Sequence, residues 1–394
     1  MRFGTSPRTT AASMALSVTA LAAAPVAPIP PTASRPTVIL IAVSGLGSRL
    51  GCYGAPVSTP NVDRLAKMGR RFDRVYSQYP ADAPSLVSLM TGLRPDKTGV
   101  WGQPAVPVEG AESLQNRFRV GGYLAARVGP IYGGQAEKAY RWGLSEDAAD
   151  PVAAARRAAE LLDAHKEGLL FLAVGLDASK APANLLEQYP PGSIAPPQDE
   201  AWEDIPAIAV SPARVERPGR MARPRALAAD GRRGLVADWN ARAAYLDAQV
   251  GTILETVDRL KLWDRVAVVF VSAHGPYLGE HGEVLRQDLL YEETLRTSLI
   301  VTSPGVQEPG REATGLTELV DVYPTLVDLC GLQRPRGLQG KSFVAALQDP
   351  RAPGKDAVYS VATRAAGSLG RSVRTDRYRY TEWPDGSEEL YDHS

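Results

Sequence analysis

Residues 35–45 read RPTVILIAVSG, and this stretch decides the fold class. It is a continuous run of β-branched and other apolar residues, which predicts a strand buried on both faces, as in parallel sheets. Similar runs recur along the chain, and helical patterns separate them. We expect strands at residues 123–128, 169–175, 266–272 and 298–302, and helices at 60–69, 151–165 and 235–260. This alternation predicts an α/β protein with a large, mostly parallel sheet flanked by helices.

The end of the chain has a different pattern. A helix is expected at residues 321–330, and short strands at 357–361, 370–374 and 377–382. They predict a small C-terminal α+β subdomain over residues 311–394, after an α/β domain over residues 35–310. Within that domain, residues 189–233 are rich in proline and arginine and predict a long loop. Its arginines either bind acidic groups of a polysaccharide or are simply solvated.

Composition limits the classes of function. The 394 residues carry 44 Lys and Arg against 44 Asp and Glu, so the net charge is zero and no nucleic-acid partner is expected. Cys52 and Cys330 lie far apart in the sequence and match no metal-binding spacing. Two unpaired structural thiols are expected, with a single disulfide as the alternative.

The N-terminus has the layout of an export signal. Arg2 and Arg8 precede an apolar, alanine-rich run over residues 11–25, and a proline-rich connector follows. This layout predicts a signal peptide and linker over residues 1–34, and a periplasmic or secreted protein after cleavage. The run is short for a membrane span, so no stable span is expected, and a retained anchor is the alternative.

A second segment, ADAPSLVSLMTG at residues 81–92, bears on function. Its Pro-Ser step followed by Leu86, Leu89 and Met90 predicts a loop that enters a short helix, with Asp82 at the helix mouth. A helix mouth presents unpaired backbone N–H groups and the positive end of the helix dipole. A carboxylate there is either a plain cap or part of an anion-handling site.

Six segments resemble the sulfatase family of the alkaline-phosphatase superfamily, and most closely its iduronate-2-sulfatase-like bacterial members. They follow the family's order from residue 35 to the end and read LGCYGAPVSTPNVDRLAKMGRRFDRVY, SLMTGLRPDKTGVW, YLDAQVGTILETVDRLKLWDR, HGPYLGEHGEV, LVDVYPTLVDLCGL and GRSVRTDRYRYTEW. The resemblance implies the alkaline-phosphatase-like sulfatase fold. It also implies a chemistry in which a cysteine becomes formylglycine, whose hydrate attacks sulfur beside a carboxylate-held divalent metal, usually Ca²⁺. Lysines, histidines and an arginine neutralise the developing charge.

The family's nucleophile motif, Cys-x-Pro-Ser-Arg, falls on residues 82–86. Asp82 stands in place of the cysteine, and Leu86 in place of the charge-stabilising arginine. Asp82 cannot become formylglycine. Three roles stay open for it: a helix cap or packing replacement, a surviving metal ligand, or a new carboxylate nucleophile.

The metal positions implied by the resemblance are also altered. The two aspartates that end the family's first strand fall on Ser44 and Gly45, and its later Asp-His pair falls on Ala273 and His274. Only Asp82 and His274 remain as vestigial ligands. They are too few for the oxygen-rich shell that Ca²⁺ prefers, so no cofactor is expected.

The anion-neutralising positions are partly replaced. The lysine and histidine of the family's Gly-Lys-x-x-His fall on Pro130 and Gly133. Its Lys-Pro-His falls on residues 178–180, where Lys180 keeps a positive charge. Arg286 best matches the lysine after GEHG, and His281 lies inside that motif. The resemblance therefore makes Lys180, His281 and Arg286 the candidate substrate-binding residues.

Intact scaffold motifs around replaced catalytic groups favour an exported pseudo-sulfatase that binds sulfated or acidic glycans or partner proteins. The alternative is a sulfuric- or phosphoric-ester hydrolase rebuilt around Asp82 and His274, with Arg286 as a third catalytic candidate. A decaying product without a selected function is the third hypothesis. Convergence of Asp82, His274 and a further acid such as Asp288 around an ion would favour the rebuilt enzyme.

Overall fold

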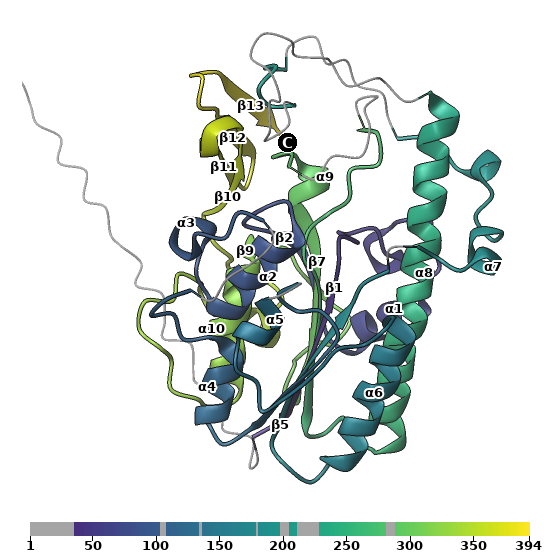
Figure 1. The fold of residues 1–394 in the computed structure, drawn as a ribbon, viewed down its shortest axis with the longest axis vertical. Coiled ribbons are helices and arrows are strands. Elements are labelled where there is room, and N and C mark those ends of the chain that lie inside the picture. The colour runs from purple at the N-terminus through teal and green to yellow at the C-terminus, as the bar shows by residue number, and fades with distance from the viewer. Residues whose placement is uncertain are drawn as a thin grey trace, which may run out of the picture.

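A large mixed sheet forms the centre of the protein. The computed structural model describes residues 35–102, 108–133, 136–178, 180–197, 205–210, 228–280 and 288–394. Over these residues the strand order is β4-β3-β5-β1-β6-β7-β2-β8, and β9 also pairs with β2 (Figure 1). The strands are β1 (Thr37–Val43), β2 (Arg70–Tyr76), β3 (Leu124–Val128), β4 (Leu144–Glu146), β5 (Leu170–Leu176), β6 (Val266–Ser272), β7 (Arg296–Thr302), β8 (Glu312–Ala313) and β9 (Thr317–Glu318).

The strand that residues 35–45 predict, β1, is central. It pairs in parallel with β5 on one side, where Val38 lies opposite Phe171, and with β6 on the other, where Val38 lies opposite Ala267. All seven of its residues are buried, which explains the unbroken apolar run. The expected strand at 298–302 lies within β7, but β7 runs antiparallel to both β6 and β2. The fold class, an α/β protein with a mostly parallel sheet, is confirmed.

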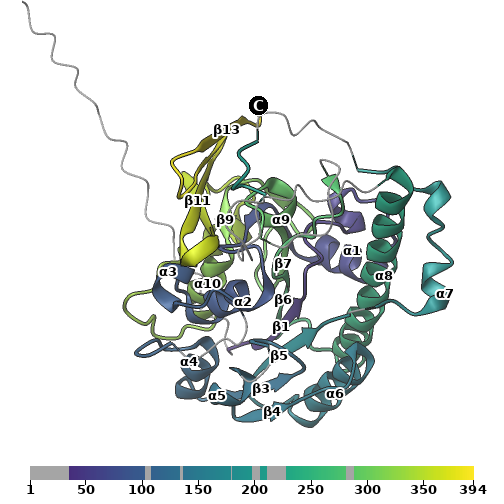
Figure 2. The same cartoon turned by 45° about the horizontal axis from the view of Figure 1, so that its top comes forward.

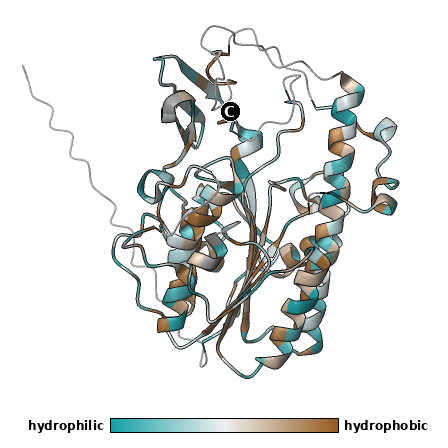
Figure 3. Cartoon of the chain, in the orientation of Figure 1, coloured by the Kyte–Doolittle hydropathy of each residue, from teal (hydrophilic) through white to brown (hydrophobic). Residues whose placement is uncertain are grey.

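Two layers of helices cover the sheet (Figure 2). One face carries α1 (Pro60–Met68), α6 (Pro151–Ala164) and α8 (Ala229–Arg259), and the other carries α2 (Asp82–Thr91), α4 (Leu114–Val120) and α10 (Val322–Leu329). The short helices are α3 (Pro95–Thr98), α5 (Ala136–Ala139), α7 (Ala183–Leu186), α9 (Glu292–Leu295) and α11 (Val344–Gln348). Apolar residues concentrate in the strands and on the inward helix faces (Figure 3).

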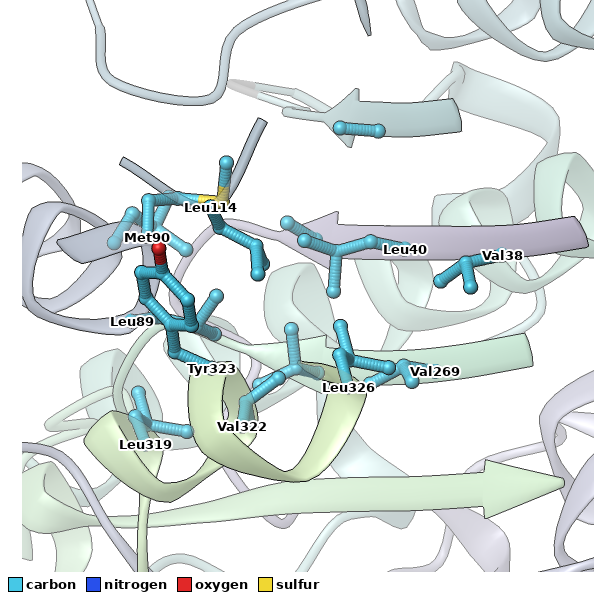
Figure 4. Packing of buried hydrophobic residues seen from close by; sticks show 14 of the residues in the cluster. Val38, Leu40, Leu89, Met90, Leu114, Val269, Leu319, Val322, Tyr323 and Leu326 are labelled. Atoms are coloured by element: carbon cyan, nitrogen blue, oxygen red, sulfur yellow. The ribbon is translucent and has the colours of Figure 1, made fainter. Parts of the chain in front are cut away.

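Alternate residues of β1 feed the two halves of the core, because successive strand side chains point to opposite faces. Val38 and Leu40 pack under α2 and α10, beside Leu89 and Tyr323 (Figure 4). Ile39 and its alternate neighbours pack under α1, α6 and α8. Burial of the α2 face fixes the start of that helix at the edge of the sheet, where the candidate site lies.

A second, antiparallel sheet follows near the C-terminus, in the order β10-β11-β12-β13. Its strands are β10 (Ala357–Thr363), β11 (Leu369–Thr375), β12 (Tyr378–Glu382) and β13 (Glu388–Asp392). This sheet confirms a small C-terminal unit, although β13 was not expected and α10 packs on the main sheet. The fully buried carboxylate of Glu318 ties this unit to the main sheet through Arg94 (2.6 Å) and Lys355. The boundary between 310 and 311 stays a prediction.

The described residues also bear on the predictions for the long loop and the leader. Residues 229–233, expected in the loop, form the first turns of α8. Most of the arginine run and the predicted signal peptide lie outside the described residues. Among the described helices, none combines the length and the apolar character that crossing a bilayer requires.

Candidate functional site

Asp82 and His274 meet at the carboxyl edge of the main sheet. Asp82 is the first residue of α2, and His274 lies two residues beyond the end of β6. Oδ1 of Asp82 lies 3.3 Å from Nε2 of His274, an ion-pair distance. The imidazole is almost fully buried, while the Asp82 side chain is 40 % exposed. The structure therefore brings together two of the three candidate catalytic residues.

Both ring nitrogens of His274 face an acceptor. Nδ1 lies 2.7 Å from the carbonyl oxygen of Gly275, which can only accept a hydrogen bond. With one nitrogen facing a carbonyl and the other a carboxylate, only the imidazolium can donate to both. Burial by itself would lower the pKa of His274, but the charge and polar contact of Asp82, together with the Gly275 carbonyl, raise it.

The cap hypothesis for Asp82 is wrong. The N-cap of α2 is Ala81, and no side chain caps the helix there. Asp82 lies one residue inside the helix, and its carboxylate approaches His274 instead of the backbone N–H groups.

Two aromatic rings occupy the surroundings of Gly45, one of the positions where the resemblance implies a metal-binding aspartate. A Cβ on Gly45 would lie 3.4 Å from Cε1 of His274 and 3.6 Å from Cζ2 of Trp239 in α8. Gly45 also has φ +56°, a conformation that side chains disfavour. Its neighbour Ser44 donates its backbone N–H to Leu176 in β5. A carboxylate at position 45 would therefore meet an indole and an imidazole instead of open space.

The donor set does not fit the family's Ca²⁺. Across the part of the chain that the structure describes, no group of three or more His, Cys, Asp or Glu side chains could hold a metal ion. Asp288, considered as a further acid, lies 3.8 Å from Arg364. Calcium requires six or more oxygen ligands, and Asp82 with His274 supplies far fewer.

Three further residues border the pair. Asp177 follows β5, and partial burial and then the negative charge of Asp82 raise its pKa, whereas Arg242 lowers it. Arg242 in α8 lies 5.0 Å from the ring centroid of Trp239 and forms an ion pair with Asp238 (2.5 Å). The sequence contained a signal for Asp177, because it directly follows a buried parallel strand, where sites gather in open α/β sheets. It contained none for Trp239, which looks like any apolar helix residue.

The loop that carries Pro130 and Gly133 serves packing. The carboxylate of Glu137 accepts hydrogen bonds from the backbone N–H groups of residues 131, 132 and 133, the last at 2.8 Å. The carbonyl of Pro130 packs so closely on Gly175 that a Cβ there would lie 1.8 Å from it. An internal carboxylate therefore holds the loop in which the resemblance implies two cations.

The other predicted positions have simple environments. Leu86 is a buried core residue of α2, and Ala273 is fully buried, with its N–H bonded to Val43. Lys180 is exposed on the loop after β5. His281 and Arg286 lie outside the described residues.

Both cysteines are free thiols. Cys52 is half-buried and Cys330 is buried. Burial is the main reason that the pKa of each rises to about 12, so neither is a thiolate nucleophile near neutral pH.

The sheet order, the helix that begins at Asp82 and the residues that follow β1, β5 and β6 define a protein of alkaline-phosphatase-like architecture. The chain belongs to the sulfatase family: the model described as Sulfatase matches residues 36–332. A second model, described as N-sulphoglucosamine sulphohydrolase, C-terminal, matches residues 279–394.

Individual relatives agree with this assignment. The chain is 26 % identical to human iduronate 2-sulfatase over 88 % of this chain and 84 % of the relative. It is 25 % identical to a sulfatase of Formosa agariphila, over 91 % and 81 % of the two chains. Among solved structures, a 2-O GAG sulfatase superposes with a TM-score of 0.76 at 21 % identity, over 91 % of this chain and 85 % of that one. The phosphonate monoester hydrolase of Agrobacterium radiobacter gives 0.75 at 19 % identity, over 91 % and 89 %.

Proposed function

We propose that this sulfatase-family protein is exported and binds sulfated glycans without hydrolysing their sulfate esters. The observation that carries the loss of catalysis is the packing around Gly45. His274 and Trp239 border the place where a ligand-bearing side chain would start, and φ +56° disfavours such a side chain. A Cβ at 3.4–3.6 Å would be in ordinary contact with both rings, so the positive φ is the main obstacle to a side chain there, and these features together favour packing over metal binding at this position.

The Asp82–His274 pair supports the same proposal. A carboxylate nucleophile must be free to attack, but Oδ1 of the Asp82 carboxylate lies 3.3 Å from Nε2 of His274, whose pKa this contact helps to raise. When His274 is protonated, its positive charge is internal to the protein and offsets the negative charge of Asp82. A catalytic metal differs from this internal charge, because its positive charge contacts both the nucleophile and the substrate and polarises the substrate for attack.

The binding part of the proposal is supported by the relatives and by the charges left at the rim. The relatives include iduronate 2-sulfatase, and a solved structure that resembles this fold holds D-glucosamine-2-N,6-O-disulfate as its substrate. Lys180 is exposed on the loop after β5, and the resemblance assigns Arg286 and His281 to substrate binding as well. Cationic side chains suit sulfate groups.

The test is a paired measurement on the purified chain. A heparin hexasaccharide and its desulfated counterpart are titrated calorimetrically, and turnover of 4-nitrophenyl sulfate is followed with and without added Ca²⁺. We expect binding that needs the sulfates, loses about tenfold in affinity in Lys180→Ala, and is accompanied by no turnover. Asp82→Cys is expected to stay inactive, because the metal and charge-neutralising groups are still missing.

Two outcomes would overturn this proposal. Turnover that depends on the metal and disappears in Asp82→Ala would establish the rebuilt hydrolase. Equal affinity for the sulfated and the desulfated hexasaccharide would remove sulfate recognition. Lys166→Ala, at an exposed lysine that pairs with Asp163 at the far end of α6, is the matched control for the Lys180 variant.

A further inference from the structure

The small C-terminal sheet buries many polar side chains. A sheet with one solvated face normally buries apolar side chains and exposes polar ones. Here the face packed on the protein interior buries Val358 and Ala362, but also polar and charged residues, namely Ser360, Ser372, Arg374, Arg379, Thr381 and Glu389. Arg379 and Tyr76 bind the carboxylate of Glu292, each at 2.7 Å, so part of this inner face is a polar network.

The outward positions of the same strands carry a set of apolar and aromatic side chains among charged ones. Tyr359 is 51 % exposed, Tyr378 40 % and Leu390 66 %. Val373 and Tyr380 are half-buried. These side chains are aligned, because Tyr359 pairs with Val373, Val373 with Tyr380, and Tyr380 with Leu390. One straight row therefore crosses all four strands.

The sheet that carries these residues lies on the side of the molecule opposite α8, as both views of the ribbon show (Figures 1 and 2). We name the aligned set the tyrosine row, defined as Tyr359, Val373, Tyr380 and Leu390. Neither the catalytic resemblance nor the Asp82–His274 pair involves any of its members. Aligned exposed apolar residues of this kind mark an interaction surface, unlike single scattered ones.

We propose that the tyrosine row binds a saccharide chain by stacking against the faces of uncharged sugar rings. Strands lie about 4.8 Å apart, so Tyr359 on β10 and Tyr380 on β12 are about 10 Å apart, close to the length of two linked pyranose rings. The C–H face of a pyranose is apolar and suits an aromatic face. Tyrosine rings also lose little conformational entropy on binding.

The charges around the row favour an uncharged ligand. Arg371 lies directly opposite Glu382 across β11 and β12, and Arg377 forms an ion pair with Asp392 at 2.6 Å. The Tyr380 hydroxyl is in hydrogen-bonding contact with Glu388. The guanidinium of Arg94, which lies 5.1 Å from the ring centroid of Tyr359, is paired with Glu318. The flanking cations thus have acidic neighbours, so the row recognises ring faces, unlike the proposed sulfate-dependent site.

The size of the face favours a saccharide over a second copy of the protein. Four strands of about five to seven residues give a face on the order of 20 Å by 20 Å, about 400 Å². A standard protein–protein interface takes about 800 Å² from each partner. A single sugar chain that lies across the strands is narrow enough for this row of side chains to contact it along its length.

Calorimetric titration of the full chain with cellohexaose, chitohexaose and xylohexaose tests this proposal. We expect at least one to bind with the same affinity at about 50 mM and about 500 mM salt, because no ion pairs form. Tyr359→Ala and Tyr380→Ala should each weaken that binding about tenfold. Tyr380→Phe should retain it, because the ring remains while the contact with Glu388 is lost.

The control is Val120→Ala on α4. Val120 is apolar and, like Leu390, 66 % exposed, and this variant should bind as the unaltered protein does. Thermal unfolding of each variant verifies folding, and Leu390→Gln, at a residue 66 % exposed on the edge strand, gives a variant with little risk to the fold. Absence of binding by all three hexasaccharides would overturn the proposal, as would undiminished binding by both alanine variants. Sedimentation showing a dimer that Leu390→Gln dissociates would instead assign the row to a second copy. Heparin hexasaccharide binding should be unchanged in Tyr380→Ala, which separates this proposal from the preceding one.

Discussion

Replacing Asp82 by asparagine should lower the pKa of His274. Nε2 of His274 lies 3.3 Å from Oδ1 of Asp82. Two unit charges at that separation interact by about 5 kcal/mol at an effective dielectric constant of about 20, and by about 1.3 kcal/mol in water. Because the Asp82 side chain is 40 % exposed, solvent screening brings the interaction to about 1–2 kcal/mol, or about one pKa unit.

The same substitution should change how stability depends on pH. The pKa of His274 is raised in the folded protein, so the folded state binds this proton more tightly than the unfolded chain does. The pair therefore stabilises the fold fully below the unfolded histidine pKa of about 6.5, and this contribution is lost as pH rises through the folded pKa. Asp82→Asn should reduce the free energy of unfolding by about 1–2 kcal/mol near pH 5.5 and by much less near pH 9.

Proton NMR titration of the imidazole C–H signals measures this pKa directly. The chain has four histidines, and His274→Gln assigns the relevant signal. Urea unfolding of the Asp82→Asn protein at the two pH values measures the stability change. An unchanged His274 pKa would refute the pairing, and so would an equal loss of stability at both pH values.

Three further predictions concern other parts of the structure. Burial raises the pKa of Glu293 to about 7, so the free energy of unfolding should fall as pH rises from 4.5 to 7. Glu293→Gln should abolish this fall. In urea unfolding near pH 8, the variant should be more stable by up to about 3 kcal/mol. A pH-independent effect would contradict this. Gly175→Ala would place a Cβ 1.8 Å from the carbonyl oxygen of Pro130, so its Tm should drop by the equivalent of about 2 kcal/mol or more; an unchanged Tm would show that the loop moves freely. Glu318→Ala removes a fully buried carboxylate from its half-buried partners Arg94 and Lys355 and should cost about 3 kcal/mol, whereas Glu312→Ala, at an exposed ion pair, should cost less than about 1 kcal/mol; equal costs would refute the difference in burial.

The parts of the fold that sequence predicted best are those with a strong periodic signal. The unbroken apolar run of β1 and the helical pattern of α6 were predicted within one or two residues of their observed bounds. The direction of β7 was not predicted, because the apolar pattern of a strand does not distinguish a parallel from an antiparallel neighbour. β2 was missed, because RRFDRVY carries charged residues at several positions, and tertiary packing alone buries Arg70, whose guanidinium bonds four or more backbone carbonyls.

The sequence by itself determined the family, the mostly parallel α/β class and the identity of the residues at the family's catalytic positions. Each of these properties follows from local sequence patterns or from the order of the motifs. Only the tertiary structure brought Trp239, 194 residues beyond Gly45, against the place where a metal ligand would begin, and paired Asp82 with His274. It also decided that the C-terminal sheet shows Tyr359 and Tyr378 to solvent and buries Arg374 and Arg379, because the direction of a face depends on which neighbour the sheet packs against.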